Sequence, residues 1–151
     1  MILIAYDGTP DAKHAVAVAG KMLRGGRAHV VHVWQPLSAV PAGVATPGAM
    51  LPDDLLDEEI ELEESRARGV ADGGADVARA AGFDADGEAI RSDGPPAQTL
   101  EDEIDRLRPE LVVIGSRGLT GLKAILRGSV SHHVGAHAHA PVLIVPPAPD
   151  A

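Results

Sequence analysis

The sequence contains no cysteine and almost no aromatic residues. Without cysteine the chain cannot form a disulfide scaffold, a thiolate metal site or a cysteine nucleophile. Phe, Tyr and Trp occur once each among the 151 residues, whereas 45% of the chain is hydrophobic, so Ala, Val, Leu and Ile must build the core. Such side chains fill the layers of an α/β fold well, and the length is that of one domain.

Basic residues and long apolar runs are also scarce. The chain has 13 Lys and Arg residues against 22 Asp and Glu residues, and its formal net charge of -9 repels nucleic-acid phosphates. No apolar run approaches the ~20 residues that cross a bilayer. The first residues combine a short apolar run with Asp7 and no basic region, which is unlike a signal peptide. We therefore expect a soluble cytoplasmic protein that binds neither nucleic acid nor membranes.

Five short segments have the composition of buried strands. Four of them are rich in Ile and Val with little polar alternation, which favours a parallel sheet covered on both faces. These four segments are 1–6, 29–34, 111–115 and 142–145. The segment 84–91 is a weaker candidate for the fifth strand.

A first helix is predicted after the first strand. Thr9 is a suitable N-cap, Pro10 fits the first turn, and Gly25 and Gly26 end the helix. One helical face carries the apolar residues Ala12, Ala15, Val16, Ala19 and Leu23.

Three further helices are predicted between the remaining strands. The second occupies about 55–81, and its acidic residues, which begin at 53 and end at 64, form a solvated face. Glycine lowers helix propensity, so an irregularity is expected near Gly73. The third helix follows Pro95 and Pro96, and the fourth begins near Ser129 and ends at about 138.

Strands and helices therefore alternate along the chain. This alternation predicts a single α/β domain with an open, doubly wound, five-stranded parallel sheet, order 3-2-1-4-5, and helices on both faces. We place the domain at 1–147, with a flexible proline-rich loop at 36–52 and a short tail at 148–151. Ligands bind such sheets beyond the carboxyl ends of the strands, at the point where the strand order reverses.

The stretch from Gly115 to Ser131 is the most informative about function. Its spacing is Gly115-x2-Gly118-x9-Gly128-Ser129, between the end of a strand and the start of a helix. Glycine lets backbone N–H groups approach a phosphate, and a helix start adds free N–H groups and a partial positive charge. Further donors and cations in the stretch are Ser129, Ser131, Arg117, Lys123 and Arg127. Three glycines can also serve only a tight turn, but their place at a strand end favours phosphate binding.

Taken in order, several stretches resemble the ATP-binding branch of the universal stress protein family. The resemblance covers nearly the whole chain and includes the glycine spacing. The matching stretches are Ile2-Leu3-Ile4-Ala5-Tyr6-Asp7-Gly8-Thr9, Val31-His32-Val33, the run from 111 to 118, Gly128-Ser129-Val130-Ser131 and the run from 139 to 145. Tyr6 stands where the family usually has a small aliphatic residue, and its ring could point into the helix layer.

The resemblance implies a role for each matching residue. Asp7 would lie beside the adenine or ribose with Ala5 nearby, and Val33 and Ile114 would pack against the adenine. The ribose and phosphates would be surrounded by Gly115, Gly118, Gly128, Ser129, Val130 and Ser131. Arg117 joins these candidates because of its charge, which, like that of Lys123 or Arg127, could offset phosphate charge. The ligand would be ATP, with AMP or another adenine nucleotide as alternatives, and Mg²⁺ would accompany ATP. Asp7 also suits a turn before the first helix, and both roles are compatible.

The resemblance predicts a binding protein active in stress response or signalling. The sequence has no Walker motif and no evident general base, so efficient ATP hydrolysis is not implied. A slow ATPase and a dimeric interaction module that needs no nucleotide remain as alternatives. The family resemblance also suggests that the apolar edge strand 142–145 pairs with a second copy to form a homodimer.

Four histidines cluster late in the chain: His132, His133, His137 and His139. His133 and His137 are four residues apart, a spacing that suits a metal ion bound from one helix face. No carboxylate or cysteine accompanies them in the local sequence. A half-buried helix near a dimer interface is the simpler interpretation.

Overall fold

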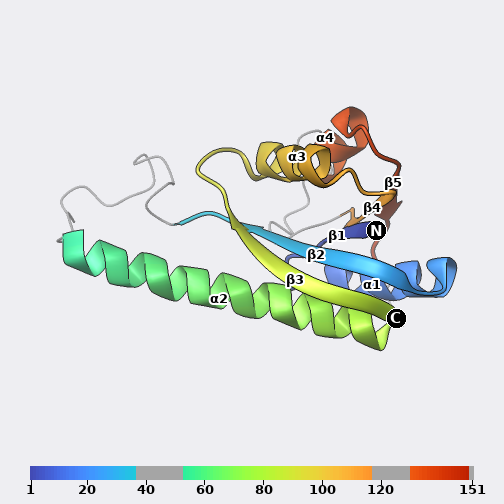
Figure 1. Cartoon of the computed structure of the whole chain (residues 1–151), viewed down its shortest axis with the longest axis horizontal. Coiled ribbons are helices and arrows are strands. Elements are labelled where there is room, and N and C mark those ends of the chain that lie inside the picture. The colour runs from blue at the N-terminus through green and yellow to red at the C-terminus, as the bar shows by residue number, and fades with distance from the viewer. Residues whose placement is uncertain (37–52, 117–129, 150–151) are drawn as a thin grey trace.

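A computed structural model describes residues 1–36, 53–116 and 130–149 of the chain. Strands and helices alternate throughout, as predicted (Figure 1). The elements are β1 (Ile2–Ala5), α1 (Pro10–Leu23), β2 (Gly26–Trp34), α2 (Asp53–Ala80), β3 (Phe83–Arg91), α3 (Pro96–Leu107), β4 (Leu111–Gly115), α4 (Val130–His137) and β5 (Val142–Val145). The proline-rich loop, apart from Pro36, lies outside the described residues.

The five strands form one parallel sheet in the order β3-β2-β1-β4-β5, which confirms the predicted topology. β1 lies at the centre, and the chain crosses first to β2 on one side and later to β4 on the other. The weaker candidate strand is β3, which pairs with β2 along its whole length from Phe83 to Arg91. β3 and β5 are the two edges of the sheet.

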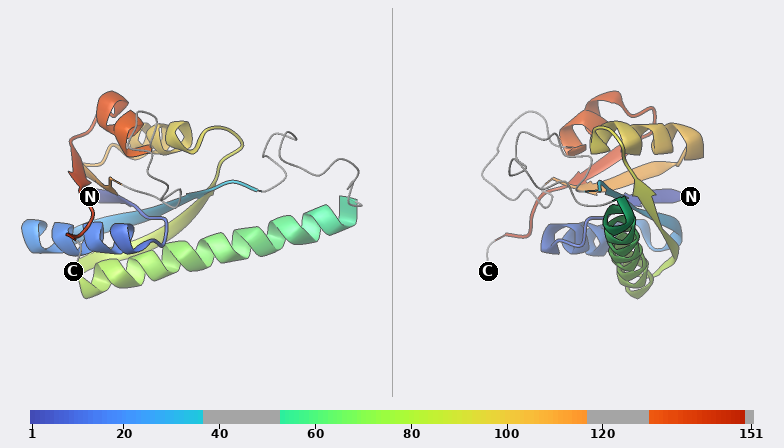
Figure 2. Two further views of the ribbon diagram at one scale, coloured as in Figure 1. Left: turned by 180° about the vertical axis from the view of Figure 1, so that it is seen from behind. Right: turned by 90° about the vertical axis from the view of Figure 1, so that its left-hand side faces the viewer.

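Two apolar cores cover the two faces of the sheet, because neighbouring residues of a strand point to opposite sides. Val30 belongs to the core formed with α1 and α2, whereas Val31 belongs to the core formed with α3 and α4. The two helix layers lie on opposite sides of the sheet in both views (Figures 1 and 2). This arrangement is the predicted doubly wound fold.

The predicted start of α1 is confirmed. The hydroxyl of Thr9 accepts a hydrogen bond from the backbone N–H of Ala12 at 3.2 Å, and Pro10 occupies the first helical position. At the other end Arg24 is left-handed with φ 52°, and Gly25 and Gly26 continue with positive φ. The helix therefore ends just before the two glycines, which permit the backbone to turn back into β2.

The irregularity predicted near Gly73 is wrong, because α2 runs unbroken for 28 residues. The structure shows why the next residue, Gly74, is a glycine. A Cβ built there would lie 2.6 Å from Cδ1 of Tyr6 and 2.8 Å from Cγ1 of Val30, so glycine lets the helix approach the sheet. The ring of Tyr6 thus packs in the helix layer, as expected. The first half of α2 projects beyond the sheet and carries acidic residues (Figure 1).

The second helix layer is shorter. α3 buries Leu100 and Ile104 as predicted, together with the carboxylate-bearing Glu103. α4 buries Ser131 and Val134, while its predicted start at Ser129 lies outside the described residues. Within the described ranges, no helix has the length and apolar character needed to cross a bilayer.

Candidate functional site

The carboxyl ends of three neighbouring strands bring the predicted apolar site residues together. Ala5 ends β1, Val33 lies near the end of β2 and Ile114 lies near the end of β4. All three belong to the core on the α3 and α4 side, and so does Val130 at the start of α4. Ile114 is buried, whereas the other three are half-buried. The strand ends therefore present apolar side chains on the α3 and α4 side of the sheet.

Asp7 lies in the turn that follows β1. Its Oδ1 accepts hydrogen bonds from the backbone N–H of Thr9 at 3.1 Å and from the Thr9 hydroxyl at 2.6 Å. Gly8 between them has φ +81°, a conformation that favours glycine. The carboxylate therefore fixes the turn and supports the N-cap of α1, so the turn role anticipated for Asp7 is confirmed.

The two ends of the glycine-spaced stretch meet at the end of β4. Gly115 is the last residue of the strand, and the N–H of Ser116 donates to the carbonyl of Val145 at 2.8 Å. The hydroxyl of the buried Ser131, in the first turn of α4, lies 3.5 Å from the carbonyl oxygen of Ser116. The N-terminus of α4 is thus held beside the end of β4.

Four predicted site residues lie outside the described residues: Arg117, Gly118, Gly128 and Ser129. Ala5, Asp7, Val33, Ile114, Gly115, Val130 and Ser131 lie within them. The structure therefore describes the strand-end side of the predicted site and the beginning of α4.

His32 is a buried residue at this end of the sheet that sequence reasoning did not single out. Its Nδ1 donates to the carbonyl of Tyr6 at 2.9 Å, and the N–H of Tyr6 donates to the carbonyl of Val31 at 2.9 Å. Burial lowers the pKa of His32 below 6.5, although the hydrogen bond to Tyr6 and the charge of Asp7 act in the opposite direction. A neutral imidazole therefore ties β2 to the segment that leads into Asp7. Burial, with the charge of Asp7, also raises the pKa of Tyr6.

Ser92 forms a second buried polar group that the sequence did not reveal. Its N–H donates to the carbonyl of Trp34 at 2.8 Å, and its hydroxyl donates to the carbonyl of Gly94 at 2.8 Å. Because a serine hydroxyl has one hydrogen, Thr99 must donate in the 2.7 Å contact between the two hydroxyls. Gln35 donates from Nε2 to the same Gly94 carbonyl at 2.5 Å. These bonds hold the start of α3 against the end of β2.

The late histidines are accompanied by carboxylates of α3 that lie far away in the sequence. Nε2 of His133 lies 2.7 Å from Oε2 of Glu101, and Nδ1 of His139 lies 3.1 Å from Oδ1 of Asp105. The rings of His133 and His137 stack with centroids 4.4 Å apart. α4 is partly buried, as expected. These contacts join α3 to α4.

Comparisons with known proteins agree with this fold. A model of the universal stress protein family matches residues 1–146. A relative from Thermus aquaticus, described as a universal stress protein in the QAH/OAS sulfhydrylase 3' region, is 32% identical over 146 residues, which cover 95% of this chain and 96% of that protein.

Solved structures show the same architecture. The hypothetical protein MJ0577 has a TM-score of 0.72 at 20% identity, covering 99% of this chain and 96% of its own. A universal stress protein in complex with cAMP has a TM-score of 0.66 at 21% identity, covering 95% and 94%. At such identities the likeness establishes the fold alone, whereas the family model spans all five strands and four helices. The chain belongs to the universal stress protein family.

Proposed function

We propose that this protein binds an adenine nucleotide, ATP foremost, at the carboxyl ends of β1, β2 and β4. The observation that carries the proposal is the grouping of Ala5, Val33, Ile114 and Val130 in one apolar cluster at these ends. Asp7 follows the same end of β1. The proposal is supported by solved neighbours described as complexes with cAMP, dAMP and AMP.

In this proposal the adenine packs on Val33 and Ile114, and Asp7 accepts a hydrogen bond from the ribose or the base. Gly115 lets the backbone approach the ligand, and the positive end of the α4 dipole, at Val130 and Ser131, favours the phosphates. Arg117, Gly118, Gly128 and Ser129 complete the phosphate side. The net charge of -9 opposes a polyphosphate, so these local donors and Mg²⁺ must compensate it.

We infer that the site binds nucleotide without efficient hydrolysis. Asp7 is the acidic side chain of the site, and its Oδ1 already accepts two hydrogen bonds from Thr9. A general base must instead be placed to take a proton from water. We therefore propose a nucleotide-dependent stress or signalling module in the cytoplasm.

The alternative of a slow ATPase would show as multiple turnovers in a phosphate-release assay with Mg²⁺.

We further propose that the module is a homodimer joined along β5. β5 is an edge of the sheet, and Ile144 on it is 42% exposed. Pairing of two copies would cover this edge. Sedimentation of wild type at micromolar concentration should show a dimer, and Ile144→Lys should shift it to monomer. Met22→Lys alters another exposed apolar residue, on α1, and should leave the dimer intact.

Calorimetric titration with ATP tests the nucleotide proposal. Wild type should bind one ATP per chain, and Gly115→Val should weaken binding at least tenfold because the added side chain crowds the strand end. The control is Gly69→Ala, since a Cβ there has no neighbour within 4 Å. A folded wild type that binds neither ATP nor AMP would remove the proposal and leave the nucleotide-independent interaction module.

A further inference from the structure

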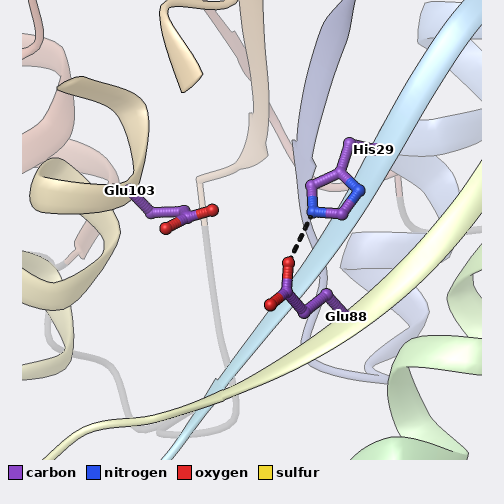
Figure 3. A group of neighbouring side chains, drawn as sticks. All are labelled: His29, Glu88 and Glu103. Atoms are coloured by element: carbon purple, nitrogen blue, oxygen red, sulfur yellow. Dashed lines mark hydrogen bonds and ion pairs between the residues drawn. The ribbon is translucent and has the colours of Figure 1, made fainter. Parts of the chain in front are cut away.

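Three side chains from different elements converge on the α3 face of the sheet, away from the proposed nucleotide site. They are His29 of β2, Glu88 of β3 and Glu103 of α3 (Figure 3). One ligand atom of each lies within 4.8 Å of the others. Among the described residues, no other group of three such side chains meets this condition.

The fold places this cluster at an edge. β3 is the outermost strand, and Asp86 on it is the register partner of His29 on β2. Glu88 lies two residues beyond Asp86 and so points to the same face. Val33 of the proposed nucleotide site lies four residues after His29 on the same strand, which is about 13 Å away. The two sites are therefore separate.

Both ring nitrogens of His29 face carboxylates. Nδ1 lies 2.5 Å from Oδ2 of Asp86, and Nε2 lies 3.0 Å from Oε2 of Glu88. Ionised carboxylates only accept hydrogen bonds, so a proton on each nitrogen satisfies both contacts. A metal ion satisfies them equally well if it replaces the Nε2 proton and Nδ1–H still donates to Asp86. Metal-binding histidines commonly donate their other N–H to a carboxylate in this way.

The charges around His29 also favour a dication. Glu103 is 8% exposed and forms a two-bond ion pair with Arg106, which is largely exposed. The three carboxylates of Asp86, Glu88 and Glu103 carry -3, and an imidazolium with Arg106 brings the sum to -1. A dication on a neutral His29 brings the same sum to zero. The buried Glu103 would then share its charge between the metal and Arg106.

We propose that Nε2 of His29 and the carboxylates of Glu88 and Glu103 bind a first-row transition-metal dication of the zinc class, with Asp86 orienting the imidazole. One nitrogen and two oxygen ligands suit such an ion, and water takes the fourth position. Ligand atoms around tetrahedral zinc lie ~3.4 Å apart, so no pair of ligand atoms has to close by more than about 1.4 Å. The side chain of Glu88 is 48% exposed and can adjust its position relative to His29 and Glu103.

The bound ion would tie the edge strand β3 to β2 and α3. Ligands that bind only the folded state raise its stability by mass action. The proposal therefore predicts that one metal ion binds per chain and that the bound ion raises the unfolding temperature. Neither depends on nucleotide binding, so the two proposals can fail separately.

Calorimetric titration of the untagged, nucleotide-free protein with Zn²⁺ is the test, with thermal unfolding as a second readout. Wild type should bind one Zn²⁺ and unfold at a higher temperature, while Mg²⁺ at the same concentration should do neither. His29→Gln and Glu88→Gln should each lower Zn²⁺ affinity at least tenfold. The matched control His14→Gln changes a histidine of α1 on the opposite side of the sheet and should keep wild-type affinity.

Two further variants separate a metal site from a structural ion-pair cluster. Asp86→Ala removes the acceptor of Nδ1–H and should weaken Zn²⁺ binding 10- to 100-fold. Arg106→Gln frees Glu103 from its competing cation and should strengthen Zn²⁺ binding, although it removes an ion pair. Absence of Zn²⁺ binding in folded wild type would mean an ion-pair cluster only and would overturn the proposal. Loss of binding in His133→Gln but not in His29→Gln would also overturn it, because the ion would then lie between α3 and α4.

Discussion

Nδ1 of His32 donates a 2.9 Å hydrogen bond to the carbonyl oxygen of Tyr6, one residue before Asp7. The imidazole is 8% exposed, and burial lowers its pKa below 6.5. A neutral histidine in this position makes the strand-end segment sensitive to acid. Charging the ring would place a cation in a buried environment, next to the turn from which Asp7 is presented.

We predict that acid destabilises the protein through His32. Above pH ~6.5 the ring is neutral in both the folded and the unfolded chain. As the pH falls through this value, the unfolded chain takes up the proton first, since the folded pKa is lower. The contribution of His32 to stability is therefore complete above pH ~6.5 and is lost as the pH falls toward the folded pKa.

Urea unfolding at pH 7.5 and 5.5 checks this prediction. Asparagine at position 32 can still donate a hydrogen bond but does not titrate, so His32→Asn should lose less free energy of unfolding between the two pH values than wild type does. An equal loss in both proteins would show that other groups cause the acid sensitivity.

Gly74→Ala should destabilise the protein although it raises helix propensity. The new methyl group would lie 2.6 Å from Cδ1 of the buried Tyr6 ring, and overpacking of this kind costs about 1–3 kcal/mol. In contrast, Gly69→Ala meets no atom within 4 Å and should stabilise α2 by about 0.5–1 kcal/mol. Denaturant unfolding of the two variants should give opposite signs; stabilisation by both would contradict the close approach of α2 to Tyr6 and to Val30 of β2.

Thr9→Ala should affect both stability and nucleotide affinity. It removes the cap of Ala12 N–H and the 2.6 Å bond to Asp7, so the free energy of unfolding should fall by about 1 kcal/mol. The carboxylate of Asp7 would also lose one of the two hydrogen bonds from Thr9 that orient it, which should weaken ATP binding in calorimetry. Thr9→Ser keeps the hydroxyl and should behave like wild type. Unchanged affinity in a destabilised Thr9→Ala protein would show that orientation of Asp7 is unimportant for binding.

The parts of the fold that follow local rules were predictable. The cap at Thr9, Pro10 in the first turn and the run 142–145 each depend on neighbouring residues in the sequence, and each appears as expected. The alternation of these elements then fixes the parallel topology through the right-handed crossover rule. The apolar grouping of Ala5 with Val33 and Ile114 follows from the same topology.

Features that depend on approach between elements were not predictable. Gly73 and Gly74 look alike in sequence, and only the packing of Tyr6 against the helix shows that Gly74 permits close contact rather than a break. His133 has no carboxylate nearby in the sequence, yet Glu101 on α3 lies beside it. Glu88 of β3 and Glu103 of α3 likewise lie far from His29 of β2 in the sequence, and only the packing of these elements brings the three side chains together.

Localisation of ATP on the protein tests the central claim most directly. Backbone amide signals followed by NMR during titration of ¹⁵N-labelled protein with ATP should shift at Ala5, Asp7, Val33, Gly115 and Val130, and not at His29 or Glu88. The signals should saturate at one nucleotide per chain. Saturable shifts confined to residues away from the carboxyl ends of β1, β2 and β4, or no shifts at all, would contradict the proposed nucleotide site.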